Sequence, residues 1–284
     1  MTMTSSRLDE VLNQAVQKLS SNLDLQEAQL DAELLLSFCL GKTRTWLKTW
    51  PEHLLTQQTQ VKFEDLVGRR LTGEPVAYII GEQEFWSLSL KVTPDTLIPR
   101  PETELLVELA LAKMPNNSNF KLADLGTGTG AIALALATER PLAQIFAVDF
   151  SESALAVAKT NRDKYQLDSV KLIHSSWLSD WPHGKLDLIV ANPPYVAPND
   201  PHLEDLSFEP ISALVADNNG YSDIIDIATQ AKQYLNTGAF LMFEHGFEQA
   251  AEVRNILQEL GYQQIDTVKD LSGQDRVTIG CYSN

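Results

Sequence analysis

The sequence predicts an α/β fold with a mostly parallel sheet, helices on both of its faces, and a small helical bundle in front of it. Three observations lead to this prediction. From residue 121 onward, short apolar runs alternate with stretches of helical period, which is the pattern of βαβ units. Residues 1–75 show helical periodicity alone. The final apolar runs, 263–268 and 276–282, lie close enough in the sequence to form an antiparallel edge hairpin.

The first domain is expected to span residues 1–75 and to consist of packed helices. Apolar residues recur at helical spacing in three stretches, two of which are followed by a glycine that would end the helix: 7–20, 26–40 before Gly41, and 57–72 before Gly73. No group of residues in this domain carries chemistry of its own. We therefore expect it to serve as a substrate-docking domain.

Residues 76–98 are expected to form a β-hairpin linker, and residues 99–284 the large domain. Phe85 to Val92 alternate like a strand, and Pro94-Asp95 marks a turn. Pro101 and the acids after it suit the first turn of a helix. Arg100, just before that helix, is either a substrate-binding residue or a plain surface charge.

The large domain is expected to contain five parallel strands and the helices that connect them. The strands fall at about 121–125, 144–149, 170–174, 186–191 and 238–244, and the helices at about 130–139, 151–165, 220–235 and 247–260. Because the carboxyl ends of parallel strands meet at one edge of the sheet, the loops after the first four strands should lie close together.

A glycine-rich loop, Asp124-Leu125-Gly126-Thr127-Gly128-Thr129-Gly130, follows the first of these strands and opens a helix. Glycines let the backbone approach a ligand closely, and a helix N-terminus presents free N–H groups. Asp149 ends the next strand, where a carboxylate can accept both ribose hydroxyls of an adenine nucleoside. The same glycines satisfy the dinucleotide pattern, so the loop alone does not separate NAD from S-adenosylmethionine.

The fourth strand ends in the loop Asn192-Pro193-Pro194-Tyr195. Asn192 offers an acceptor and a donor, and the prolines make a stiff loop whose carbonyls can only accept. Tyr195 adds an aromatic wall. Such a loop suits a planar NH2 group, which favours methyl transfer from a sulfonium over hydride transfer. Trp177, after the third strand, would lie beside an adenine ring or pack in the core.

Composition and charge limit the class of partner. The chain has 284 residues and a net charge of −16, and a nucleic-acid backbone usually requires a basic face. Cys39 and Cys281 are the only cysteines, and no metal-ligand spacing is present. We expect no metal, no direct nucleic-acid partner and no membrane segment, and hence a cytoplasmic protein.

These motifs resemble the HemK family of release-factor glutamine methyltransferases. The resemblance extends over nearly the whole chain, through 81–86, 97–104, the glycine loop, 192–195, 208–210, 244–246 and 275–277. It implies a Rossmann-like class I methyltransferase sheet beside the helical domain. It also implies methyl transfer from S-adenosyl-L-methionine to the side-chain nitrogen of the Gln in the Gly-Gly-Gln motif of peptide chain release factors.

The resemblance implies roles for individual residues. The cofactor would be held by Gly126, Thr127, Gly128, Thr129, Gly130, Asp149 and Trp177, with Asn192 touching cofactor and substrate. Asn192, Pro193, Pro194 and Tyr195 would be catalytic and would bind the glutamine amide, with Arg100 near the substrate. His245 is expected near the site in a packing role. Two departures from the family pattern are Ser176, where relatives often carry Asp, and the glycine-poor segment 217–221.

Two other functions are considered. The Asn-Pro-Pro-Tyr loop alone also resembles amino-methyltransferases that act on an exocyclic base NH2 of RNA or DNA, but the charge of −16 counts against a nucleic-acid substrate. The second alternative is a non-catalytic module that only binds S-adenosylmethionine. The presence of Asn192 and Tyr195 counts against this alternative.

Overall fold

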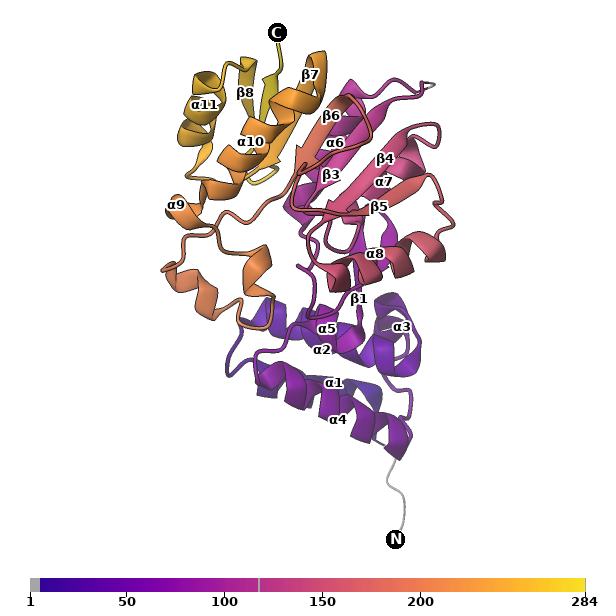
Figure 1. The fold of residues 1–284 in the computed structure, drawn as a ribbon. Helices are drawn as coiled ribbons and strands as arrows, with labels where there is room; N and C mark the ends of the chain where they lie inside the picture. Colours follow the sequence, from indigo (N-terminus) through magenta and orange to yellow (C-terminus); the bar gives the residue numbers. More distant parts are fainter. Residues whose placement is uncertain (1–5, 117, 284) are drawn as a thin grey trace. The chain divides into compact units, whose positions relative to one another are not determined.

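The computed structural model describes residues 6–116 and 118–283, and the chain divides into two compact units after Gly81 (Figure 1). The first unit holds five helices: α1 (Leu8–Leu19), α2 (Leu25–Leu40), α3 (Arg44–Thr49), α4 (Gln57–Leu71) and α5 (Val76–Ile80). Each unit has its own hydrophobic core.

Side-chain caps fix where the helices of the first unit begin. Asp24 accepts hydrogen bonds from two backbone N–H groups of α2, and Thr43 and Thr56 each accept one at the starts of α3 and α4. Gly41 ends α2 in the left-handed region, at φ 61°. These ends agree with the helices predicted from apolar spacing.

The stretch expected to be a hairpin linker contains a helix as well as a hairpin. Residues 76–80 form α5, which contacts α2 and α4 of the first unit. The hairpin consists of β1 (Glu82–Phe85) and β2 (Leu88–Lys91), in the second unit. Its two turn residues, Trp86 and Ser87, both have positive φ, as a tight two-residue turn requires. The five residues before Gly81 are too few to show helical periodicity, so the sequence pattern did not reveal α5.

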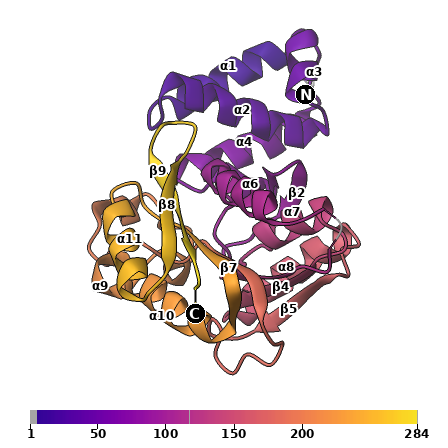
Figure 2. The same cartoon turned by 90° about the horizontal axis from the view of Figure 1, so that it is seen from above.

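The second unit is built on a seven-stranded sheet of order β5-β4-β3-β6-β7-β9-β8. Its strands are β3 (Lys121–Leu125), β4 (Gln144–Asp149), β5 (Val170–His174), β6 (Leu186–Ala191), β7 (Leu235–Glu244), β8 (Gln263–Lys269) and β9 (Asp275–Cys281). The first five are parallel, and β9 pairs antiparallel with both β7 and β8. Figure 2 shows the β8–β9 hairpin beside β7. The predicted fold class and edge hairpin are confirmed.

Helices cover both faces of this sheet. They are α6 (Glu104–Lys113), α7 (Ala131–Glu139), α8 (Glu152–Lys164), α9 (Asp217–Gly220), α10 (Ser222–Tyr234) and α11 (Ala250–Glu259), with 3-10 turns η1 (Pro101–Thr103), η2 (Pro201–Glu204) and η3 (Ile211–Ala213). One buried cluster joins α6 and α7 to the sheet, and a second joins α10 and α11 to it. Among the described residues, no helix combines the length and the apolarity needed to cross a membrane.

Candidate active site

The glycine loop between β3 and α7 is a tight turn held by backbone hydrogen bonds. The N–H groups of Gly126 and Thr127 both donate to the carbonyl of Val148, the residue before Asp149 on β4, at 2.9 Å. Gly126, Gly128 and Gly130 all have positive φ, which glycine adopts without strain. The turn therefore depends on glycine at these three positions.

The buried carboxylate of Asp124 stabilises the glycine loop through hydrogen bonds. Its side chain is fully buried and its Oδ2 accepts from the Thr127 hydroxyl at 2.6 Å and from the Ala133 N–H at 3.1 Å. Burial raises the pKa of Asp124 to about 7, despite these two hydrogen bonds. The Thr127 side chain thus bonds within the loop, and Asn161 binds the Thr129 carbonyl through its Nδ2 at 2.9 Å.

Asp149 joins the second strand end to the glycine loop. Its Oδ2 accepts from the Gly128 N–H at 2.8 Å and its Oδ1 from the Ser151 N–H at 2.9 Å. Burial raises the pKa of Asp149, while these backbone donors oppose the rise. A carboxylate has about four lone-pair sites, so each oxygen keeps one for a further donor.

A cavity of about 340 Å³ opens over the glycine loop, and we call it the glycine-loop cavity. Five of the residues predicted to hold the cofactor line it: Gly126, Gly128, Asp149, Trp177 and Asn192. Gly130 does not line it, and a Cβ there would lie 3.2 Å from Leu134. Thr127 and Thr129 line a small cleft of about 50 Å³ that also reaches Asn192.

Two aromatic rings lie at the rim of the glycine-loop cavity. A Cβ on Gly126 would meet the Trp177 ring at 3.4 Å, so the indole packs over the glycine. Trp177 also donates to the carboxylate of Asp223, a cavity residue whose pKa is raised by burial. Phe150, next to Asp149, lines the same cavity with 55% of its surface exposed. Ser176 lines the cavity as well.

A second cavity, of about 320 Å³, is also lined by Asn192, and we call it the proline-loop cavity. It is lined by Arg100, Asn192, Pro193 and Tyr195, together with Leu97, Val196, Leu206, Ala213 and Leu214. Pro194, predicted to touch the substrate, lines the glycine-loop cavity instead. Asn192, Leu97 and Ala213 border both cavities, so the two cavities are adjacent.

Glu209 fixes the segment that carries Arg100. Its buried carboxylate forms an ion pair with the Arg100 guanidinium and accepts from the Ile98 N–H at 3.0 Å. Arg100 is therefore neither a free surface charge nor an unpaired cation. The 208–210 motif, which had no assigned role, ties the segment before α6 to the loop after η2.

The Asn192-Pro193-Pro194-Tyr195 loop is held by residues far away in the sequence. The Tyr195 carbonyl accepts from the Gln249 Nε2 at 3.0 Å, and the Gln249 Oε1 accepts from the Gly246 N–H at 2.9 Å. A Cβ on Gly220 would lie 2.1 Å from the Tyr195 carbonyl oxygen, so only glycine fits there. In the glycine-poor segment 217–221, Asn218 and Asn219 adopt the left-handed conformation, which asparagine tolerates.

Burial keeps the Tyr195 phenol neutral. It raises the pKa of Tyr195 to about 12, with a further rise from the carboxylate of Glu244. The ring can therefore act as a wall and a neutral hydrogen-bonding group, and not as a base near neutral pH.

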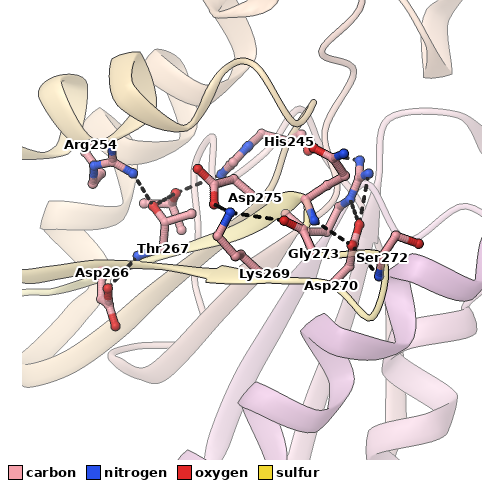
Figure 3. Close-up of polar contacts among 12 residues, drawn as sticks. His245, Arg254, Asp266, Thr267, Lys269, Asp270, Ser272, Gly273 and Asp275 are labelled. Atoms are coloured by element: carbon pink, nitrogen blue, oxygen red, sulfur yellow. Dashed lines mark hydrogen bonds and ion pairs between the residues drawn. The ribbon is translucent and has the colours of Figure 1, made fainter.

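His245 directly follows β7 and takes part in a chain of hydrogen bonds that runs to Arg254 (Figure 3). Its Nδ1 donates to the Gly246 carbonyl at 2.9 Å, because a carbonyl can only accept, so its Nε2 accepts from the Thr278 hydroxyl at 2.8 Å. Thr278 in turn accepts from Thr267, and Thr267 accepts from Arg254. Burial lowers the pKa of His245, which keeps the ring neutral. His245 thus joins the end of β7 to Thr278 of β9.

Sequence reasoning missed several residues of the site, among them Leu97, Thr103, Phe150 and Asp223. Thr103 accepts a hydrogen bond from the Asn192 Nδ2 at 3.3 Å, yet the two residues are 89 positions apart. In the part of the chain that the structure describes, no cluster of three or more His, Cys, Asp or Glu could hold a metal ion.

The seven-stranded sheet with its antiparallel β9 edge, the glycine loop with its acidic partner on β4, and the Asn-Pro-Pro-Tyr loop after β6 together place the chain in the class of S-adenosylmethionine-dependent methyltransferases. Two family models match the chain: "PrmC N-terminal domain" over residues 10–81 and "Methyltransferase small domain" over residues 102–206. The chain belongs to the release factor glutamine methyltransferase family, because close relatives match it over nearly its whole length.

One relative, the release factor glutamine methyltransferase of Shewanella oneidensis, is 51% identical over 257 residues, which are 90% of each chain. The enzyme of that name from Escherichia coli is 42% identical and covers 95% of this chain and 97% of its own. A methyltransferase crystal structure from Pyrococcus furiosus shares the fold, with a TM-score of 0.54 at 16% identity over 78% of this chain and 100% of that one. The resemblance inferred from the motifs is thus confirmed.

Proposed function

We propose that this chain transfers a methyl group from S-adenosyl-L-methionine to the side-chain amide nitrogen of the Gln in the Gly-Gly-Gln motif of release factors, with Asn192 at the meeting point of the two substrates. The observation that carries this assignment of residues is that Asn192 borders both cavities. The family to which the chain belongs supports the reaction, and the names of the chain's relatives support release factors as the substrate.

The glycine-loop cavity fits the cofactor by shape and by chemistry. Its carboxylates, Asp149 and Asp223, would accept hydrogen bonds from ribose hydroxyls and from an ammonium group, and its rings, Trp177 and Phe150, would cover an adenine. Gly128 leaves room for a ligand close to the backbone, because nothing lies within 4 Å of its would-be Cβ. When bound, the cofactor supplies an electrophilic methyl group on a sulfonium.

The proline-loop cavity contains groups that can hold an amide nitrogen in position for methyl transfer. An amide nitrogen is a poor nucleophile because its lone pair is delocalised, so the site must hold it in line with the methyl group. We assign this role to the Asn192 side-chain oxygen and the Pro193 carbonyl, which would accept the two N–H hydrogens. Pro193, Pro194 and Tyr195 would keep the loop stiff and exclude water.

The test of this function is transfer of a labelled methyl group from S-adenosylmethionine to purified release factor, tRNA, rRNA and DNA in parallel. We expect label in the release factor alone, on the Gly-Gly-Gln glutamine by peptide mass analysis. Label in a nucleic acid and none in the release factor would favour the amino-methyltransferase alternative.

We also propose that the first unit docks the release factor, in the cytoplasm where translation takes place. The unit has its own core and carries none of the cavity residues described above. Removing residues 1–81 should raise KM for intact release factor about tenfold or more, as loss of a docking surface does, while KM for a short Gly-Gly-Gln peptide stays nearly unchanged. Equal effects on both substrates would show that the unit only supports folding.

A further inference from the structure

The buried carboxylate of Glu244 is a group to which the mechanism above gives no role. Glu244 ends β7 with 1% of its surface exposed, and its Oε2 has no hydrogen-bond partner among the described residues. A buried, incompletely paired carboxylate costs stability, so a role in function is a reasonable explanation for its presence.

The neighbours of Glu244 connect it to the reaction site. Ala191 and Phe243 are paired across the parallel strands β6 and β7, so the next residues, Asn192 and Glu244, leave the same edge of the sheet side by side. Hydrogen bonding from the Thr103 hydroxyl and the Asn192 side-chain amide opposes the rise in the pKa of Glu244 that burial causes. The Asn192 Nδ2 also donates to the Thr103 Oγ1 at 3.3 Å, which leaves the Thr103 hydrogen free for Glu244. The NH2 end of the Asn192 amide therefore faces Thr103 and Glu244.

The orientation of this amide decides what a substrate would meet. In a planar amide the oxygen and the NH2 group point in different directions, and exchanging them requires a rotation about the last side-chain bond. An ionised carboxylate cannot donate, so the flipped amide would place two acceptors against each other. Glu244 thus opposes the flip, and Oδ1 stays available as the acceptor.

Resting on the function proposed above, we propose that Glu244 is a positioning residue for methyl transfer: through Thr103 and directly, its carboxylate fixes the Asn192 amide so that Oδ1 accepts from the glutamine NH2. During transfer the S–CH3 bond breaks with its electron pair left on sulfur, and the N–C bond forms from the amide lone pair. Positive charge moves to the nitrogen until one of its protons passes to solvent water. A fixed acceptor at the NH2 group stabilises that charge.

The charge state of Glu244 makes the proposal testable by pH. Burial raises the pKa of Glu244 to about 7, and the negative charge of Glu102 in η1 adds to the rise. Hydrogen bonding from Thr103 and Asn192 and the positive charge of Arg276 on β9 lower the pKa and oppose this rise. Tyr195 also faces it but stays neutral. Below its pKa the protonated acid can donate to a flipped Asn192 oxygen, so kcat should rise as pH increases through about 7.

The experiment compares Glu244→Gln with the unchanged enzyme on a Gly-Gly-Gln peptide between about pH 6 and pH 8, a range that spans the raised pKa. Gln keeps the size but can donate to the flipped amide at every pH. We expect kcat to fall about tenfold, with KM for peptide and cofactor within about twofold, and the rise around neutral pH to disappear. An unchanged kcat and pH profile in Glu244→Gln would overturn the proposal.

A double-mutant cycle separates positioning from general structural damage. Thr103→Val should reproduce most of the loss, and the double variant should lose little more, because both residues act on the same amide. Fully additive losses would overturn the proposal. Thr267→Val, in the His245 chain of hydrogen bonds, is the matched control and should lower the melting temperature without changing the pH profile of kcat.

Failure of this inference can be told apart from failure of the function itself. If the unchanged enzyme methylates release factor and Glu244→Gln does so equally well, only the role of Glu244 is refuted. If the unchanged enzyme methylates no release factor, the function is refuted and this inference with it. If Glu244→Gln does not fold, Thr103→Val carries the kinetic test alone.

Discussion

The glycine loop and the Asn192–Tyr195 loop follow neighbouring strands of the same sheet, yet they are stabilised in opposite ways. The glycine loop is held mainly by groups within it and on the adjacent strand, namely Asp124, the Val148 carbonyl and Asp149, with one further hydrogen bond from α8 to the Thr129 carbonyl. The Asn192–Tyr195 loop is held by Thr103, Gly220 and Gln249, which come from three other elements.

This difference predicts which of the two loops keeps its conformation when residues elsewhere in the molecule are substituted. A loop built from local contacts keeps its shape when distant elements shift, which suits a cofactor that is the same in every reaction. A loop held by distant elements changes its conformation when any one of those elements shifts. The substrate side should therefore be the half on which remote substitutions act.

The largest effect is expected at Asn192, where the two halves meet. Asn192→Ala should lower methyl transfer about 10²–10³-fold, since one preorganised hydrogen-bonding group is worth about 2–4 kcal/mol in a transition state. Asn192→Asp keeps an acceptor but removes the donors to Thr103, so it should also be impaired. Single-turnover kinetics on folded variants measure both. A normal rate in Asn192→Ala would show that the meeting point of the cavities is not the reaction centre.

Gly220→Ala tests the remote support of the Asn192–Tyr195 loop. The new methyl group would lie 2.1 Å from the Tyr195 carbonyl oxygen, at φ 88°. Overpacking of about 1–3 kcal/mol adds to left-handed strain of about 1–2 kcal/mol, so the free energy of unfolding should fall by roughly their sum. Urea unfolding measures the loss.

Gly238→Ala is the matched control for that substitution. Gly238 also has positive φ, but nothing lies within 4 Å of its would-be Cβ. It should therefore lose only the strain of about 1–2 kcal/mol, and methyl transfer should be unchanged. Equal losses in both variants would mean that the contact with Tyr195 contributes nothing.

Asp149→Ala acts on the local half of the site. Ribose hydroxyls left without an acceptor should weaken S-adenosylmethionine binding by about 1–3 kcal/mol, and the Gly128 N–H would also lose its partner. Calorimetry with the cofactor and with its demethylated product measures the change. KM for the peptide should change little. A loss of peptide binding with unchanged cofactor binding would show that Asp149 belongs to the substrate side of the site and not to the cofactor side.

The smallest effect is a dependence of stability on pH from Asp124. Its folded pKa of about 7 lies above the unfolded value, so the folded state binds more protons in between and stability falls as pH rises through that interval. Asp124→Asn should reduce the loss of melting temperature between about pH 5 and about pH 7, since Asn carries no titrating charge. The same loss in both proteins would place the responsible proton on another group.

How far the sequence predicts this protein depends on the range of the contacts involved. Apolar periodicity placed β3, β4, β5 and β6 at their observed bounds, because a buried strand records its environment in its own side chains. The glycine loop and Asp149 could likewise be identified, since their contacts join one strand end to the next. By contrast, α5 was missed because five residues are too short for a periodic signal.

The sequence by itself determined the strand–loop–helix frame, the glycine loop and the chemistry of the Asn-Pro-Pro-Tyr motif, because each of these depends on neighbouring residues. The tertiary structure alone decided that Pro194 lines the glycine-loop cavity, that Arg100 is paired with Glu209, and that Thr103 and Glu244 face Asn192. Those contacts join residues up to 141 positions apart, between Thr103 and Glu244, and no local pattern encodes a pairing over that distance.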